Sequence, residues 1–194
     1  TFIEARRQFI LSQIVSLSIK EELDEWTKGI SIKWPNDIYW NEKKICGILI
    51  ENDLSGHHIG RSISGIGVNI NQETFRSDAP NPVSLKQITG QEHERYLILA
   101  NIMRRLKEYY ILLQTDSSGN AANCIAERYA RSLFRREGFH RYADADGEFL
   151  ARLLCVEPDG RFILEDQAGK VRGYLFKEVQ YIPVSYTHLR AHET

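Results

Sequence analysis

The chain has 194 residues and a formal net charge of −1, with 25 lysines and arginines against 26 aspartates and glutamates. This balance argues against a general affinity for nucleic acid, and the length is enough for one full domain and a small second one. No apolar run approaches the ~20 residues of a transmembrane helix. The three cysteines, Cys46, Cys124 and Cys155, are odd in number and widely spaced, which indicates free thiols in a reducing, cytoplasmic compartment.

The first predicted element is an amphipathic helix over residues 1–20. Its apolar residues recur at multiples of three and four positions, as one helix face requires: Ile3, Ile10, Ile14 and Leu17. The charged run 20–25 predicts a solvated helix end or loop, after which Gly29 opens the first strand. We expect this helix to pack on the sheet that follows.

Three predicted strands within residues 31–71 carry most of the side chains that point to chemistry. In the first strand, alternation places Ile30, Ile32 and Trp34 on one face and Lys33 on the other. Because proline cannot donate to a strand ladder, Trp34-Pro35-Asn36-Asp37 should end this strand at an exposed turn. Lys33 is therefore expected to point away from the apolar side of the sheet.

The second and third strands follow predicted connections at 41–44 and 53–60, and both contain glycines. Alternation places Gly65, Gly67 and Asn69 on one face of the third strand, and Gly47 repeats the pattern in the second. Glycine in a strand interior leaves room for a ligand or another backbone. Such a notch beside a lysine suits a flat, negatively charged ligand; the alternative is a buried sheet in which the glycines mark a bulge and Lys33 merely reaches solvent.

The remaining chain predicts a long loop, two helices and a group of short strands. The loop covers residues 71–90 and could close over a nucleotide. The first helix, over 92–114, should bury one apolar face: Leu99, Ile102, Met103, Leu106, Tyr109, Tyr110 and Leu113. The second should end near Arg135, and short strands with turns after Gly138 are typical of a small barrel or meander. Residues 184–194 are expected to be a non-native tail translated from vector or adaptor sequence.

Taken together, three ordered segments resemble the catalytic core of the biotin-protein ligases: Lys33-Trp34-Pro35-Asn36-Asp37, Gly47-Ile48-Leu49-Ile50-Glu51 and Gly65-Ile66-Gly67-Val68-Asn69-Ile70-Asn71. The resemblance implies an α+β fold with a mixed or antiparallel sheet and helices on one face, the class II synthetase-like core of biotin and lipoate ligases, over residues 1–137. It further implies a small SH3-like β-barrel over 138–183. The family's Gly/Arg-rich loop is expected upstream of Thr1, so the chain is interpreted as incomplete at its N-terminus.

The same resemblance implies biotin and ATP as substrates, Mg²⁺ on the ATP phosphates, and a lysine of a biotin carboxyl carrier protein as acceptor. It implies a catalytic and biotin-binding role for Lys33, which would lie against the biotin carboxylate and the adenylate phosphate. The other implied biotin-binding residues are Gly47, Ile48, Gly65 and Gly67. The implied nucleotide-binding residues are Asn36, Asp37 and Asn69, and no metal-ligating residue is assigned.

Three other functions are compatible with the sequence. A lipoate-protein ligase or transferase shares the sheet architecture and also relies on a lysine. A non-catalytic module could instead bind a carrier protein through residues 138–183. Some bacterial members of the family also repress transcription through an upstream DNA-binding domain, which the near-neutral charge of this chain does not support. The sequence leaves the formation of a homodimer open.

Overall fold

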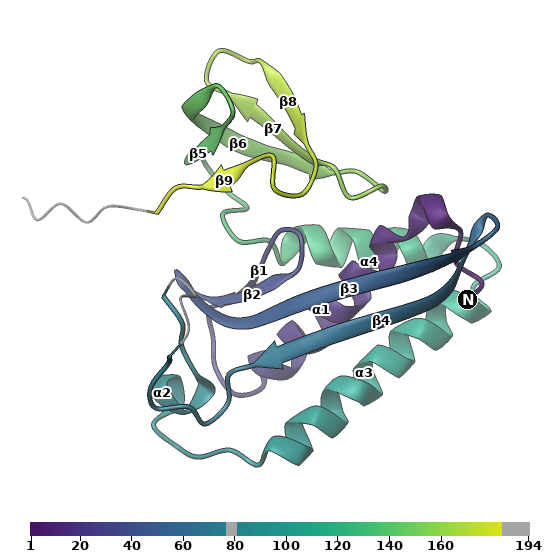
Figure 1. Ribbon diagram of the computed structural model, residues 1–194, viewed down its shortest axis with the longest axis vertical. Coiled ribbons are helices and arrows are strands. Elements are labelled where there is room, and N and C mark those ends of the chain that lie inside the picture. The colour runs from purple at the N-terminus through teal and green to yellow at the C-terminus, as the bar shows by residue number, and fades with distance from the viewer. Residues whose placement is uncertain (77–80, 184–194) are drawn as a thin grey trace, which may run out of the picture.

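Two antiparallel sheets organise the chain in the computed structural model, which describes residues 1–76 and 81–183 (Figure 1). The first sheet has the order β1-β2-β3-β4, with β1 (Ile30–Lys33), β2 (Asp37–Trp40), β3 (Lys43–Ser55) and β4 (His58–Val68). The second sheet has the order β8-β7-β6-β5-β9, with β5 (His140–Asp144), β6 (Gly147–Val156), β7 (Phe162–Asp166), β8 (Val171–Tyr174) and β9 (Gln180–Tyr181).

Helices cover one face of the first sheet. Helix α1 (Phe9–Asp24) contacts β1 and β2 and lies between α3 (Arg95–Thr115) and α4 (Asn120–Arg131) (Figure 1). Within the described ranges, none of these helices is long and apolar enough to cross a membrane. The predicted α+β fold with helices on one face of the sheet is thus confirmed, whereas the SH3-like barrel stays a prediction because the second sheet does not close on itself in the described residues.

The core between α1 and the first sheet follows the predicted alternation. Ile30 and Ile32 of β1 are buried, while the intervening Ser31 and the following Lys33 are partly exposed. Leu17 and Ile14 of α1 are almost completely buried in the same core. The side of the sheet opposite the helices is consequently the side to which Lys33 points.

The predicted helix over residues 1–20 is wrong at its start and too short at its end. A 3-10 turn, η1 (Ala5–Arg7), precedes α1, and the backbone N–H of Ile59 donates to the carbonyl of Ile3 at 2.8 Å. Ile3 is thus buried by pairing with β4, although its spacing fits a helix face. The run 20–25, predicted as a solvated helix end or loop, is indeed mostly the last turn of α1, but Glu22 and Leu23 within it are buried.

Two further predictions need correction after β4. The loop predicted over 71–90 contains helix α2 (Leu85–Thr89), which Ser84 and Gln87 begin with a capping box and Gly90 ends in the left-handed conformation. Residues 77–80 of that loop lie outside the described ranges, as does the tail predicted over 184–194. The predicted connection 53–60 is shorter than expected, because β3 and β4 continue to Ser55 and from His58.

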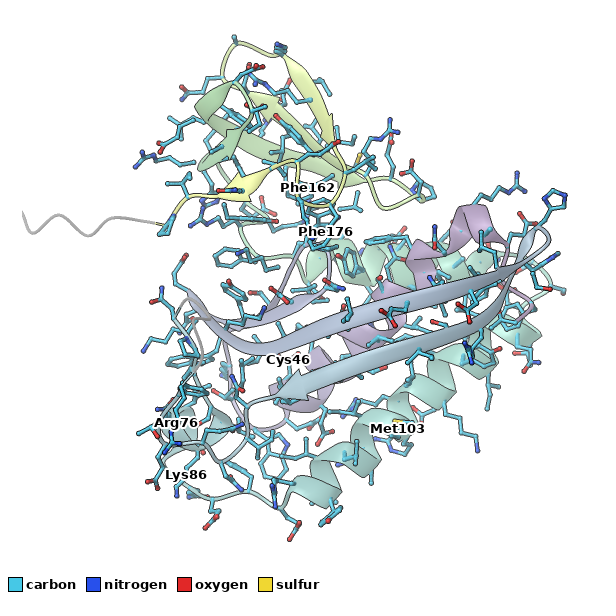
Figure 2. The ribbon with its side chains drawn as sticks, viewed as in Figure 1. Cys46, Arg76, Lys86, Met103, Phe162 and Phe176 are labelled. Atoms are coloured by element: carbon cyan, nitrogen blue, oxygen red, sulfur yellow. The ribbon has the colours of Figure 1, made fainter. Side chains whose placement is uncertain are left out.

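Helix α3 is confirmed, but two of its predicted core residues are about half exposed. Ile102 and Tyr109 are buried, whereas Leu99 and Met103 are 54% and 52% exposed. Figure 2 shows Met103 on α3. Helix α4 ends at Arg131, earlier than the predicted Arg135, because the following backbone bonds to β1: the N–H of Ile32 donates to the carbonyl of Ser132 at 2.8 Å.

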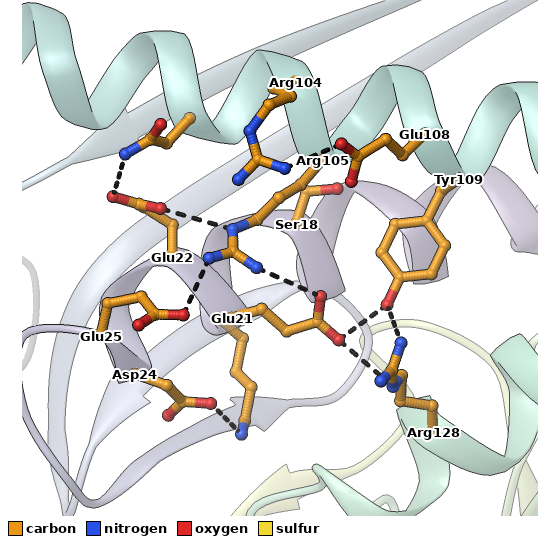
Figure 3. A network of polar contacts seen from close by, with 12 residues as sticks. Ser18, Glu21, Glu22, Asp24, Glu25, Arg104, Arg105, Glu108, Tyr109 and Arg128 are labelled. Atoms are coloured by element: carbon orange, nitrogen blue, oxygen red, sulfur yellow. Dashed lines mark hydrogen bonds and ion pairs between the residues drawn. The ribbon is translucent and has the colours of Figure 1, made fainter.

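A polar network joins the C-terminal part of α1 to α3 (Figure 3). Its centre is Glu22, whose side chain is 1% exposed and accepts hydrogen bonds from Asn101 and Trp26, each at 3.1 Å. The Arg105 guanidinium supplies the charge partner, with Nε 3.3 Å from Glu22 Oε2 and Nη2 3.0 Å from Glu25 Oε1. Arg105 is therefore the cation that makes a buried carboxylate tolerable between the two helices.

Replacing Arg105 with methionine should lower the free energy of unfolding by about 3 kcal/mol, because a buried carboxylate loses its cation. The matched control is Arg104→Met, one residue earlier on α3, where the ion pair with Glu108 is exposed and should contribute at most about 1 kcal/mol. Urea denaturation of both variants measures the difference. Equal losses would show that the buried position of Glu22 has no energetic consequence.

The two sheets meet at the turn that follows β1. Trp34 is buried, its Nε1–H donates to the carbonyl of Gly160 at 2.9 Å, and its ring stacks with centroids 4.8 Å apart on Phe162, which Figure 2 labels in the second sheet. A Cβ atom at Gly160 would lie 2.6 Å from the ring of Phe9 in α1. The β6–β7 turn is thus fitted closely against both α1 and the Trp34 turn.

Gly160→Ala should destabilise the chain by about 1–3 kcal/mol more than Gly169→Ala. Both glycines have φ in the left-handed region, at +94° and +81°, so both substitutions carry backbone strain. Only Gly160 also meets a ring, since nothing lies within 4 Å of a Cβ at Gly169. Thermal or urea unfolding checks the difference, and equal effects would mean that Phe9 moves aside without cost.

Candidate functional site

Three glycines lie together on the uncovered side of the first sheet. In the β3–β4 register Gly47 is directly opposite Gly67, and Leu49 is opposite Gly65. Residues directly opposite in an antiparallel pair share a face. The predicted alignment of Gly47, Gly65 and Gly67 is therefore present, and we call this surface the glycine face.

The glycine face is open to its surroundings. A Cβ atom at Gly65 or Gly67 would meet only carbonyl oxygens, at 3.8 Å and 3.9 Å, and both glycines are exposed. A buried sheet with a bulge at Gly65 and Gly67, the alternative interpretation of the sequence, is thereby excluded, because this stretch of β3 and β4 pairs in regular register. The missing side chains leave a strip of accessible backbone at three of the four paired positions, and the exposed side chain of Leu49 stands at the fourth.

A lysine and a carboxylate border this strip. Lys44 Nζ lies 2.7 Å from Asp37 Oδ2, and both side chains are about 70% buried, with exposed fractions of 27% and 29%. A Cβ at Gly47 would lie 3.4 Å from Lys44 Nζ and 3.8 Å from Asp37 Oδ1. The ion pair therefore lies directly beside the glycine face, where its positive partner can meet an anionic ligand.

Lys33 lies on the same side of the sheet, but its ammonium is directed elsewhere. Its backbone is paired with Asp37, yet its Nζ donates to the hydroxyl of Tyr39 at 3.0 Å. The same nitrogen lies 4.9 Å from the ring centre of Tyr39 and 5.1 Å from that of Tyr181. Burial lowers the pKa of Lys33, and nearby Asp37 offsets part of this effect.

The asparagines near the glycine face bond to backbone. Asn36 Nδ2 donates to the carbonyl of Ile48 at 3.1 Å and fixes the Trp34 turn on β3. Asn69 Nδ2 donates to the carbonyl of Val83 at 3.2 Å, and its own carbonyl accepts from the N–H of Leu85 at 3.0 Å. These bonds fix Asn36 beside Ile48 of β3 and Asn69 just after the end of β4.

Ile48 of the second motif and the neighbouring Cys46 face the core. Ile48 is 9% exposed and belongs to the apolar core, so only its backbone is near the glycine face. Cys46 is buried on the same side, and its burial raises the pKa of the thiol to about 12. A neutral, buried thiol is a poor nucleophile. The geometry is thus suited to binding and charge stabilisation by fixed groups rather than to covalent catalysis by Cys46.

Lys44 is the residue that sequence reasoning missed. It lies three positions before Gly47, so strict alternation places it on the opposite face. The register shifts between Ile38 and Tyr39, whose partners on β3 are Cys46 and Lys44, and this irregularity turns Lys44 to the glycine face. The signal available in the sequence was the adjacent apolar pair Ile45-Cys46, which breaks the alternation and is buried at both positions.

Sequence comparisons identify relatives over most of the chain. Residues 3–69 match the model of the biotin/lipoate A/B protein ligase family. The bifunctional ligase/repressor BirA of Bacillus spizizenii is 30% identical over 143 residues, which are 71% of this chain and 42% of the relative. The biotin–[acetyl-CoA-carboxylase] ligase of Paracoccus denitrificans is 31% identical over 153 residues, 73% of this chain and 59% of the relative. The chain thus spans about half the length of these relatives.

Solved structures agree with the sequence matches. The biotin protein ligase of Aquifex aeolicus, in complex with biotin and ATP, aligns with a TM-score of 0.69 and 25% identity over 90% of this chain and 72% of that one. A biotin protein ligase-like protein from Silicibacter aligns with a TM-score of 0.71 at 10% identity, over 89% and 74% of the two chains. At that identity the second match shows the fold alone.

Proposed function

Because the chain belongs to the biotin protein ligase family, we propose that it forms part of an ATP-dependent ligase that attaches biotin to a carrier protein. The observation that carries this proposal is the glycine face with the Lys44–Asp37 pair at its border. A flat ring system with a terminal carboxylate fits a strip of bare backbone that ends at an ammonium group. The solved structure of the Aquifex aeolicus biotin protein ligase contains biotin and ATP, the two ligands of this proposal.

The proposed reaction has two steps. A carboxylate oxygen of biotin attacks the α-phosphorus of ATP, the bond from that phosphorus to the bridging oxygen breaks, and pyrophosphate leaves. The amine of a carrier lysine then attacks the carbonyl carbon of biotinyl-5'-AMP, AMP leaves, and the amine loses a proton as the amide forms. Both steps build negative charge on oxygen atoms, which fixed cations at a partly buried site stabilise.

Lysines supply that positive charge in our proposal. Lys44 is beside the glycine face and would contact the biotin carboxylate and the α-phosphate. Lys33, the catalytic residue expected from the sequence, keeps a proposed role as a second cation on the same side of the sheet. Asp37 would orient the Lys44 ammonium through their charge-assisted hydrogen bond.

We assign the remaining motif residues to the two ligands. The backbone at Gly47, Gly65, Gly67 and Ile48 would line biotin, because no side chain of the glycines intervenes. Asn36, Asp37 and Asn69 would lie on the nucleotide side. Mg²⁺ would arrive with ATP and neutralise its phosphates.

We divide the chain into a ligase core over 1–137 and a C-terminal unit over 138–183, which we propose to be an SH3-like barrel. The five short antiparallel strands of the second sheet support that assignment. The acceptor would be a biotin carboxyl carrier protein, as the name of the Paracoccus relative implies. The three free cysteines favour a cytoplasmic location. Two alternatives, a lipoate ligase and a non-catalytic carrier-binding module, make different predictions.

Biotin-dependent exchange between pyrophosphate and ATP tests the proposal. The protein that contains this chain should incorporate labelled pyrophosphate into ATP when biotin is present and not when lipoate replaces it. Lipoate-dependent exchange would identify the lipoate ligase instead. No exchange with either acid, together with carrier binding by the chain, would favour the non-catalytic module.

A further inference from the structure

Lys33 lies at the junction of the two sheets, between aromatic rings that come from each of them. Tyr39 belongs to β2 of the first sheet and Tyr181 to β9 of the second, 142 positions later in the chain. The distances from Lys33 Nζ to the two ring centres, 4.9 Å and 5.1 Å, are within the range of a cation–π contact. The second sheet thus contributes one side of the site that holds this ammonium group.

The ring of Tyr181 is held firmly in place. It packs against Phe134, Phe162 and Tyr142, with centroid distances of 5.8, 5.9 and 5.2 Å. The adjacent carbonyl of Ile182 accepts from Arg135 Nη1 at 2.9 Å. The hydroxyl of Tyr181 is buried and has no hydrogen-bond partner among the described residues, so it is the ring face, not the hydroxyl, that serves Lys33.

The charges around Lys33 show what this placement prevents. Asp37 is the cross-strand partner of Lys33, while its carboxylate binds Lys44. Arg135 and Glu42, joined at 3.3 Å, are the other charged groups that act on Lys33. Without an aromatic face on each side, the Lys33 ammonium would turn to the carboxylate whose charge acts on it most strongly, that of Asp37, and would compete with Lys44 for it.

We propose that Tyr181 is a positioning residue of the site: its ring holds Lys33 beside Tyr39 and so leaves Asp37 to orient Lys44 at the glycine face. The catalytic part of this inference rests on the proposed function, whereas the placement of Lys33 does not. The second sheet thereby becomes part of the site without touching a ligand. The lowered pKa of Lys33, caused mainly by burial, agrees with an ammonium held by rings rather than by a carboxylate.

The test compares Tyr181→Phe with Tyr181→Leu. Phenylalanine keeps the ring and removes only the buried hydroxyl, whereas leucine removes the ring. Competitive labelling of lysine amines across a pH series, read by mass spectrometry at Lys33, reports the pKa of this amine without any need for activity. Lys43, an exposed lysine on β3, is the internal control.

We expect Lys33 to titrate below its usual range in the wild type and in Tyr181→Phe, and to return toward that range in Tyr181→Leu. The rate of biotin-dependent exchange should fall about 2- to 30-fold in Tyr181→Leu, the range that a cation–π contact supplies, and stay unchanged in Tyr181→Phe.

Pentafluorophenylalanine at position 181 keeps the ring shape but reverses the charge of its face, so it should act like leucine even if Tyr181→Leu fails to fold. Identical Lys33 titration in wild type and the fluorinated variant, or equal behaviour of the phenylalanine and leucine variants, would overturn the proposal. A changed titration in a protein without exchange activity would instead contradict only the proposed function.

Discussion

Replacing Lys44 with methionine is expected to lower the rate of biotin-dependent pyrophosphate exchange by about 10²- to 10³-fold. The reason is its location: the ammonium is 2.7 Å from Asp37 and 3.4 Å from a Cβ position at Gly47, beside the strip where the ligand would lie. Methionine retains the length of the side chain and removes its charge. The effect should therefore appear in the rate at saturating biotin and ATP, because charge develops in the transition state.

Lys43→Met is the control for this prediction. Lys43 is the preceding residue, is exposed, and carries the same charge, so both variants change the net charge of the protein equally. The Lys43 variant should retain activity close to that of the wild type. If both variants lose the same activity, the effect comes from the overall charge and not from the position of Lys44.

Gly67→Val is expected to weaken biotin binding by more than about 100-fold without destabilising the chain. A Cβ at Gly67 would meet nothing closer than the carbonyl of Gly47 at 3.9 Å, so valine fits the folded protein, and valine favours strands. Its side chain would nevertheless occupy the strip on which we place biotin. Loss of binding with unchanged stability separates a ligand surface from a merely structural glycine.

Isothermal titration with biotin and thermal unfolding measure the two effects on the same preparations. Arg61→Val is the matched control, because Arg61 lies on the same side of β4 and is exposed, six positions from Gly67. It should bind biotin as the wild type does. If Gly67→Val binds biotin normally, the glycine face is not the biotin site.

Alternation in the sequence was enough to predict the glycine face. Gly65 and Gly67 share a parity, and the pairing of Gly47 with Gly67 brings both strands to the same side. Such patterns depend only on the period of an extended backbone, which a regular stretch of sheet preserves. The buried side of β1 and the helix α3 follow from local periodicity in the same way.

Features that depend on irregular backbone or on distant contacts were not predictable. A one-residue register shift in β2–β3 reverses the face of Lys44; the adjacent apolar pair Ile45-Cys46 indicates that alternation breaks there, but it does not specify the shift. The direction of the Lys33 ammonium depends on Tyr181, which is distant in sequence. Likewise, Ile3 is buried by β4 and not by the helix that its spacing indicates.

The three segments that resemble biotin ligases lie together in the first sheet, but the resemblance does not specify where each side chain points. The catalytic role of Lys33 stays a prediction, and in this structure its Nζ donates to the hydroxyl of Tyr39. Ile48 was assigned to biotin, although its side chain belongs to the core. Motifs locate a site along the chain, whereas the sheet register decides which side chains reach it.

The most direct measurement is an amide NMR titration of the chain with biotin, with and without ATP. We predict that the largest shifts occur at the backbone amides of Gly47, Gly65 and Gly67, with smaller ones at Lys44 and Asp37. If these glycine amides do not shift while other amides show saturable shifts with biotin, the glycine face is not the biotin site.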